Sequence, residues 1–132
     1  MKGVSVIVSC HNSSDRLPPT LKHLGSQKTN TEIAWEIIVI DNASSDNTQR
    51  CARKILSQYN IPFKIIEEPQ LGLSYARRRG IMESNYDFII FCDDDNWLNS
   101  EYVQRVYYLL DKYSDIGVLG GNGTARRLHG SR

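Results

Sequence analysis

The feature that most constrains the fold of this chain is a set of short apolar runs that recur at regular intervals. Five of these runs are predicted to be strands, at residues 4–9, 35–40, 62–66, 88–92 and 116–120. Near-continuous apolar runs of this length are typical of parallel strands covered on both faces. The sequence therefore predicts a mostly parallel sheet of about five strands.

Helical patterns lie between the predicted strands. Apolar residues share one helical face in four places: Leu17, Leu21 and Leu24; Cys51, Ile55, Leu56 and Tyr59; Tyr75, Ala76 and Ile81; and Val103, Val106, Tyr107 and Leu110. We expect the second helix to be capped by Ser45 or Asp46. Gly80 weakens the third helix, so we expect it to permit close contact with the sheet. The alternation of strands and helices predicts an α/β fold, with residues 124–132 as a loop or frayed end.

Length and composition are those of an ordinary globular domain. The chain has 132 residues, of which 40% are apolar and 23% charged, and its formal net charge is +1. This balance implies no long-range electrostatic field that would attract nucleic acid or a membrane surface. Its three cysteines show no CxxC spacing, so we interpret them as small buried hydrophobes in a reducing compartment. No signal peptide or membrane-spanning stretch is evident, which predicts a soluble, cytoplasmic chain.

Polar residues collect where the predicted strands end. Residues 10–14, 41–46, 67–72 and 93–96 each follow a strand. Ligands of open parallel sheets bind beyond the carboxyl ends of the strands, so we expect these segments to converge on one edge. The strongest concentration of carboxylates there is Asp93-Asp94-Asp95.

The acidic run Asp93-Asp94-Asp95 has two interpretations. Adjacent carboxylates repel one another, and Mg²⁺ or Mn²⁺ removes that conflict by binding one or two of them together with substrate phosphates. Alternatively, the run is a solvated turn whose Asp caps a helix. The triplet alone does not decide between the two, but its place directly after an apolar strand favours the metal.

Other polar residues are ambiguous when taken singly. Asp41 fits an Asx turn or a remote helix cap as well as an acceptor for a nucleotide's base or sugar. His11, at a strand end, is interpreted as a hydrogen-bonded surface residue. Among Arg77, Arg78 and Arg79, only one or two can face the site and answer phosphate charge, because they lie on one helix.

Four blocks of sequence carry a resemblance to a known family. VSVIVSCHN at 4–12, IIVIDNASSDNT at 37–48, GLSYARRRGI at 72–81 and FIIFCDDDNWL at 88–98 resemble, in order, the successive blocks of glycosyltransferase family 2. The resemblance covers essentially the whole chain and implies the Rossmann-like GT-A fold. His11 stands where the family commonly has an aromatic residue, and Arg78 stands where the GxxxARNxG block has Asn. Both departures concern finer details of the substrate.

The resemblance implies a nucleotide pocket built from residues of three blocks. Ser9, His11 and Asn12 would line this pocket. Asp41 would hydrogen-bond the base, most often uracil in this family. Arg77 would lie near the base or the diphosphate.

The resemblance also implies a metal site. The acidic run corresponds to the family's DxD motif, with Asp93 and Asp95 at its ends. Asp94 would lie by the ribose or the sugar, and Asp95, helped by Asp93, would bind Mg²⁺ or Mn²⁺. The ion would neutralise the leaving nucleoside diphosphate.

The implied reaction is inverting transfer of a sugar from a nucleoside-diphosphate sugar, with UDP-sugars favoured, to a saccharide or lipid-linked acceptor in cell-surface polysaccharide biosynthesis. In this family the general base lies in the second half of the domain, and no block here matches it. We therefore expect residues 1–132 to be the donor-binding part of a longer enzyme, with the base beyond Arg132. Such a fragment is expected to bind nucleotide weakly, to transfer sugar poorly or not at all and to self-associate. The full-length enzyme is expected in the cytoplasm or at the inner face of the membrane.

Competing functions explain the sequence less well. A regulatory, metal-binding α/β domain of the receiver kind collects carboxylates at strand ends, but its acidic pair follows the first strand, where this chain has Cys10-His11-Asn12. Phosphatases with a nucleophilic Asp after the first strand meet the same difficulty. A purely structural module leaves the acidic run unexplained, and no GxGxxG follows the first strand.

Overall fold

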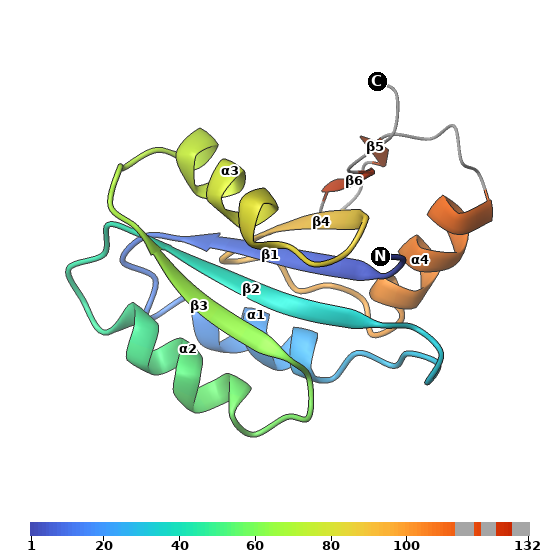
Figure 1. Ribbon diagram of the computed structural model, residues 1–132. Coiled ribbons are helices and arrows are strands. Elements are labelled where there is room, and N and C mark those ends of the chain that lie inside the picture. The colour runs from blue at the N-terminus through green and yellow to red at the C-terminus, as the bar shows by residue number, and fades with distance from the viewer. Residues whose placement is uncertain (113–117, 120–123, 128–132) are drawn as a thin grey trace.

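The computed structural model describes residues 1–112, 118–119 and 124–127. Strands and helices alternate in the order β1 (Val4–Cys10), α1 (Leu17–Gly25), β2 (Trp35–Asn42), α2 (Thr48–Leu56), β3 (Phe63–Glu68), α3 (Leu73–Glu83), β4 (Phe88–Asp93), α4 (Tyr102–Lys112), β5 (Val118–Leu119) and β6 (Thr124–Arg127). The α/β class and the four predicted helices are confirmed (Figure 1).

The sheet has the strand order β3-β2-β1-β4-β6-β5. Its first four members are parallel, whereas β6 runs antiparallel to β4 and β5 antiparallel to β6. The mostly parallel sheet is thus confirmed, with an antiparallel pair added at one end. Of the predicted fifth strand, residues 118–119 form β5, and residues 116, 117 and 120 lie outside the described residues.

The prediction of a loop at residues 124–132 was wrong for 124–127, which form β6; residues 128–132 lie outside the described part. The segment TARR is polar and carries no apolar alternation, so periodicity could not reveal it. Backbone hydrogen bonds to β4 place it in the sheet.

Two cores pack on opposite faces of the sheet. Val4, Val6 and Val8 of β1 point into the larger core, which α1, α2 and α4 cover. Ile7 points the other way, into a smaller core under α3. Figure 1 shows α3 on one side of the sheet and α1 and α2 on the other. This double coverage explains why the strands read as continuous apolar runs.

Gly80 lets α3 approach the sheet, as the sequence predicted. A Cβ atom at this position would lie 2.4 Å from Cγ2 of Ile7 in β1. Only a residue without a side chain fits there. The contact fixes α3 over the middle of the sheet, so that its first turn lies at the carboxyl ends of β1 and β4.

Helix starts bring polar side chains to the same edge. The N-cap residue of α2 is Asn47, which makes no side-chain capping bond, so the predicted N-cap at Ser45 or Asp46 was wrong by one or two residues. Asp46 Oδ1 nevertheless accepts from the backbone N–H of Thr48, the first residue of α2, over 3.1 Å. Pro18 and Pro19 occupy the first turn of α1, where proline is tolerated.

None of the described helices is long and apolar enough to cross a membrane.

Candidate functional site

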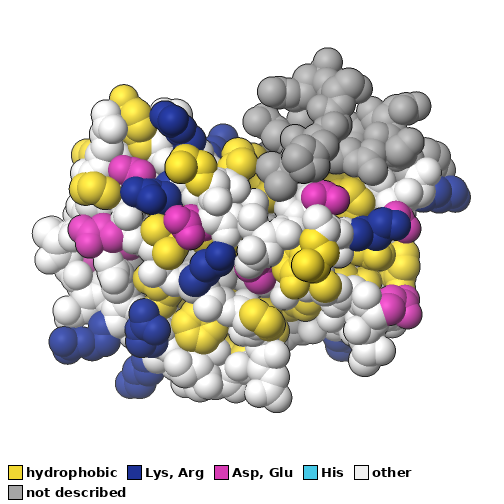
Figure 2. Space-filling view, viewed as in Figure 1, with side chains coloured by type: hydrophobic (Ala, Val, Ile, Leu, Met, Phe, Trp, Pro, Cys, Tyr) yellow, Lys and Arg dark blue, Asp and Glu magenta, His cyan; other side chains and the backbone are white. Residues whose placement is uncertain are grey.

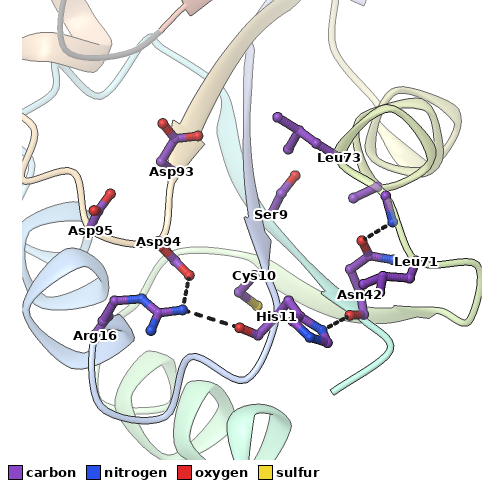
Figure 3. Close-up of a pocket in the computed structure, with 12 residues that line it drawn as sticks. Ser9, Cys10, His11, Arg16, Asn42, Leu71, Leu73, Asp93, Asp94 and Asp95 are labelled. Carbon is purple, nitrogen blue, oxygen red and sulfur yellow. Dashed lines mark hydrogen bonds and ion pairs between the residues drawn. The ribbon is translucent and has the colours of Figure 1, made fainter. Parts of the chain in front are cut away.

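A cavity of about 500 Å³ opens at the carboxyl edge of the parallel strands. It lies between the ends of β1 and β4 and the first turn of α3 (Figure 3). Its lining comprises Ser9, Cys10, His11, Arg16, Asn42, Leu71, Gly72, Leu73, Ala76, Asp93, Asp94 and Asp95. The convergence predicted from the strand ends is therefore found, and Ser9, His11 and all three aspartates take part in it.

The ends of the acidic run differ from its middle. Asp93 is the last residue of β4 and pairs in register with Ser9 of β1, so the two side chains lie on the same face of the sheet. Asp93 and Asp95 are exposed, and within the described residues their carboxylates make no hydrogen bond or ion pair. These two carboxylates are the ones open to a ligand from the cavity.

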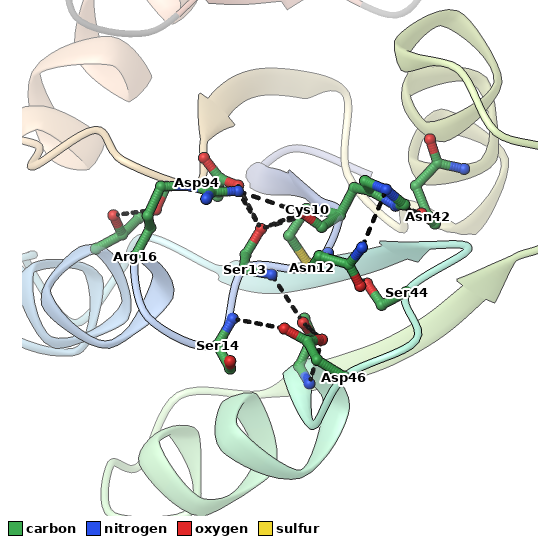
Figure 4. Close-up of polar contacts among 12 residues, drawn as sticks. Cys10, Asn12, Ser13, Ser14, Arg16, Asn42, Ser44, Asp46 and Asp94 are labelled. Atoms are coloured by element: carbon green, nitrogen blue, oxygen red, sulfur yellow. Dashed lines mark hydrogen bonds and ion pairs between the residues drawn. The ribbon is translucent and has the colours of Figure 1, made fainter.

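Asp94 is half-buried and held by its neighbours. Its Oδ2 accepts a hydrogen bond from the Ser13 hydroxyl and forms an ion pair with Arg16, whose Nη2 lies 3.1 Å away. The Thr20 hydroxyl of α1 donates to the Asp94 backbone carbonyl over 2.7 Å. Figure 4 shows Ser13 and Arg16, from the loop between β1 and α1, in contact with Asp94 of the acidic run. The neighbouring carboxylate also raises the pKa of Arg16, first through its hydrogen bond.

His11 lies on the rim of the cavity and contacts β2. Its Nδ1 lies 2.6 Å from the backbone carbonyl oxygen of Asn42. Asn42 in turn accepts from the Gly72 backbone N–H over 2.9 Å and donates from Nδ2 to the carbonyls of Glu68 and Gln70. Asn42 therefore holds the loop that leads into α3, and this role was not foreseen from the sequence.

Asn12 lies beside the cavity but does not line it. Its backbone N–H donates to the Ser44 hydroxyl over 2.9 Å, and its Oδ1 accepts from the Ser45 backbone N–H over 2.8 Å. Asn12 and Ala43 both have positive φ, 48° and 56°, which is uncommon for residues other than glycine. The two loops that carry them are thus held in a special conformation next to the site.

Asp41 is buried beside the cavity and does not line it, because β2 continues through Asp41 to Asn42 instead of ending at residue 40 as predicted. The side chain is 4% exposed, and its Oδ2 accepts a 2.6 Å hydrogen bond from Gln49 Nε2. Its Oδ1 is buried and has no partner among the described residues. Buried polar atoms are nearly always paired, so this oxygen is an acceptor without its donor.

The three arginines of α3 have different environments. Arg77 lines a second cavity of about 520 Å³, which shares Leu73 with the first, and its guanidinium carbon lies 4.9 Å from the centroid of the Phe91 ring. Its Nε is buried and has no partner in the described structure. Arg78 is exposed, and Arg79 pairs with Glu68 of β3. Arg77 is thus near the first cavity without lining it.

The cysteines have the environments expected of small apolar residues. Cys10 and Cys92 are buried and Cys51 is half-buried, and all three are free thiols. Burial, followed by nearby aspartates, raises the pKa of the Cys10 and Cys92 thiols to about 12. Although Cys10 lines the cavity, burial thus favours its protonated thiol over the thiolate, which is the nucleophilic form.

The described residues do not form a complete metal site of their own. No group of three or more His, Cys, Asp or Glu side chains in residues 1–112 is arranged to hold an ion. Asp93 and Asp95 do offer two exposed oxygen donors at one edge. Mg²⁺ is commonly bound through one or two carboxylates plus substrate phosphates, so this donor set fits a divalent ion that arrives with a diphosphate.

Several cavity residues were not singled out from the sequence. No sequence signal marked Arg16 as a site residue, because it follows the first strand by six positions and belongs to no acidic or glycine-rich block. Asn42 adjoins Asp41, and from the sequence only the aspartate is assigned a ligand-binding role. Leu71, Leu73 and Ala76 are apolar, and apolar residues in a helix pattern indicate a core before they indicate a pocket.

Comparison with family models places the chain in one family. The model of Glycosyl transferase family 2 matches residues 5–126. A curated relative, poly-beta-1,6-N-acetyl-D-glucosamine synthase of Staphylococcus aureus (strain MSSA476), is 27% identical over 129 residues, which are 96% of this chain and 30% of the relative. Glycosyltransferase AglE of Haloferax volcanii is 29% identical over 119 residues, 90% of this chain and 38% of its own. The chain thus spans about a third of the length of these relatives.

Solved structures show the same fold. S. aureus TarS 1-349 in complex with UDP-GlcNAc aligns with a TM-score of 0.75 and 26% identity, covering 92% of this chain and 36% of the TarS 1-349 chain. Mannosyltransferase PcManGT of Pyrobaculum calidifontis, solved with GDP-Man and Mn²⁺, aligns with a TM-score of 0.81 and 18% identity over 94% of this chain and 44% of its own. The transferase interpretation is therefore preferred to the receiver-like alternative, and the chain belongs to glycosyltransferase family 2.

Proposed function

We propose that this chain is the donor-binding part of an inverting glycosyltransferase that moves a sugar from a UDP-sugar to a saccharide or lipid-linked acceptor. The observation that carries the proposal is the cavity at the carboxyl edge of the sheet, with the free carboxylates of Asp93 and Asp95 on its wall. The similarity to TarS, solved with UDP-GlcNAc, and to a poly-N-acetylglucosamine synthase supports a UDP-sugar and a role in cell-surface polysaccharide synthesis.

The nucleotide is proposed to bind over β1 and β2. The unpaired Oδ1 of Asp41 is suited to accept a hydrogen bond from a base N–H, such as that of uracil. Ser9 and His11 line the cavity, and Asn12 shapes the loop beside it. Arg77, from the adjoining cavity, is proposed to approach the base or the diphosphate.

Asp93 and Asp95 are proposed to hold a divalent cation, with Asp95 as the principal ligand. When bound, the cation would neutralise the charge that develops on the leaving nucleoside diphosphate. The two carboxylates would hold the ion to which the diphosphate also binds, and Asp94 would accept a hydrogen bond from a hydroxyl of the ribose or sugar. No carboxylate of the described residues is proposed as the general base, which is proposed to lie in the second half of the family's domain.

Calorimetric titration tests this proposal. UDP, GDP and dTDP are titrated into the chain with and without Mn²⁺, and we expect UDP to bind most tightly and only with the ion. Asp95→Asn should abolish the Mn²⁺-dependent binding of UDP, because it removes the anionic ligand while keeping the size of the side chain. The matched control is Asp111→Asn, which alters an exposed aspartate of α4 that pairs with Lys2.

Two results would count against the proposal. Metal-independent binding of UDP by the parent chain would remove the role of the acidic run. Unchanged Mn²⁺-dependent binding in Asp95→Asn would show that another residue is the ligand. Robust sugar transfer by the purified chain would, separately, overturn the expectation that its base lies elsewhere.

A further inference from the structure

Arg16 occupies a position where a cation is unfavourable for the helix. It is the N-cap residue of α1, and the first turn of that helix contains no acidic residue. Helix N-termini carry partial positive charge, so an arginine there costs stability unless an anion offsets it. Residues that break a local rule often serve the site instead of the fold.

The guanidinium of Arg16 is held in a defined place despite being half exposed. Nη2 lies 3.1 Å from Asp94 Oδ2, 3.2 Å from the His11 carbonyl oxygen and 3.3 Å from the Ser13 hydroxyl. The side chain is 51% exposed and that of Asp94 is 17% exposed. The pair is therefore partly desolvated on the carboxylate side and lies on the wall of the cavity (Figure 3).

Asp94 is thereby fixed through both its backbone and its side chain. Ser13 and Arg16 both contact Oδ2, and Thr20 holds the backbone carbonyl. Oδ1 takes part in none of these contacts. One oxygen of Asp94 is thus committed to the protein and the other is left for a ligand, whereas Asp93 and Asp95 on either side stay unengaged within the described residues.

We propose that Arg16 is a positioning residue that acts through Asp94, holding one oxygen of that carboxylate so that the other can accept a hydrogen bond from a hydroxyl of the donor. This inference rests on the proposed function, and it concerns a residue that the acidic run does not contain. A merely structural surface pair would contribute little and would not affect binding. A direct phosphate contact by Arg16 is the competing explanation, because Arg16 is the one cation among the cavity-lining residues named above.

Titration of two ligands separates these explanations. UDP and inorganic pyrophosphate are titrated in the presence of Mn²⁺ into the parent chain, Arg16→Ala, Arg16→Lys and Arg105→Ala. The last variant is the matched control, since Arg105 pairs with Glu101 on an exposed face of α4. We expect Arg16→Ala to raise the Kd of UDP by about tenfold, the loss of one charge-assisted hydrogen bond. Pyrophosphate affinity should be unchanged, and Arg16→Lys should recover part of the loss.

A double-mutant cycle adds a second criterion. In an Asp94→Asn background, Arg16→Ala should change the Kd of UDP little further, because the carboxylate that it positions is gone. Equal losses for UDP and pyrophosphate, or a full effect of Arg16→Ala in the Asp94→Asn background, would indicate direct phosphate binding and overturn the proposal. No loss in Arg16→Ala would overturn it as well.

Side-chain NMR couplings of Asp94 in the free protein make the test independent of nucleotide binding. We expect one rotamer in the parent chain and averaging in Arg16→Ala. If the parent chain failed to bind UDP, the proposed function and the ligand assigned to Asp94 would both be wrong. The couplings would still decide whether Arg16 fixes this side chain, and averaging in the parent chain would overturn that claim too.

Discussion

Gly80 is the residue at which α3 comes closest to the sheet. In an ordinary helix, replacing glycine by alanine stabilises the protein by about 1 kcal/mol. Here the new methyl group would lie 2.4 Å from Cγ2 of Ile7, which is buried and cannot move aside without disturbing β1. The local gain and the tertiary clash therefore have opposite signs, and the clash is the larger.

We predict that Gly80→Ala lowers the free energy of unfolding by about 1–3 kcal/mol, the usual cost of overpacking a core. Urea denaturation followed by circular dichroism measures it. In an Ile7→Ala background the cost should shrink, because the atoms that the methyl group meets are removed. A stabilised Gly80→Ala variant would show that α3 does not lie as close to β1 as described.

At the scale of the element, the loops after β1 and β2 are joined by hydrogen bonds. Asp46 Oδ2 accepts from the Ser14 backbone N–H over 3.3 Å, and Oδ1 accepts from the Thr48 backbone and hydroxyl. The hydrogen bond from the Thr48 side chain is the first cause that lowers the pKa of Asp46. Although Asn47 is the N-cap, the carboxylate of Asp46 thus satisfies the first backbone N–H of α2 and ties the helix to the loop that precedes α1 (Figure 4).

Asp46→Ala is predicted to lower the free energy of unfolding by about 1 kcal/mol at neutral pH, as for other lost caps. Because the pKa of Asp46 is lower in the folded state, this stabilisation is present above the unfolded pKa and is lost as pH falls through the folded value. The difference between variant and parent should therefore shrink below about pH 4.

Thermal unfolding at several pH values measures this difference. Asp15→Ala is the control, since Asp15 is an exposed carboxylate of the loop between β1 and α1, which Asp46 contacts through Ser14, and Asp15 accepts no hydrogen bond within the described residues. A difference for Asp46→Ala that persisted unchanged at low pH would mean that the charge of Asp46 contributes nothing to the cap.

At the scale of the whole molecule, part of the described surface consists of a strand edge and exposed apolar side chains. β3 lies at one end of the described sheet and pairs only with β2 there. On α3 and the loop before it, Leu71, Leu73, Tyr75 and Met82 are exposed large hydrophobic residues. Figure 2 shows hydrophobic side chains interspersed with charged ones on the face in view. Strand edges and apolar patches of this kind are sites of association.

We predict that the chain self-associates as its concentration rises. Multi-angle light scattering from micromolar to near-millimolar protein should show an average mass above that of one chain. Met82→Lys, on the 66% exposed Met82, should lower the average mass if the surface of α3 takes part. The mass of one chain at every concentration would contradict the prediction.

The sequence by itself determined the α/β class of the fold, a mostly parallel sheet and the edge where the site lies. These follow from short-range regularities, namely apolar runs, helical faces and polar residues at strand ends, which each segment expresses alone. The resemblance to glycosyltransferase family 2 also rests on local blocks of sequence, such as residues 37–48 and 88–98. Gly80 could also be foreseen, because a glycine inside a helix costs stability that only a close contact repays.

Only the tertiary structure decided which side chains of that edge are committed and which are free. The pairing of Arg16 with Asp94 joins residues 78 positions apart, and Asn42 reaches the loop before α3 across 30 positions. Polar TARR becomes β6 because β4 offers it backbone partners. Hydrogen bonds and ion pairs between distant segments leave no periodic trace in a sequence, since they depend on where the fold brings the chain back on itself.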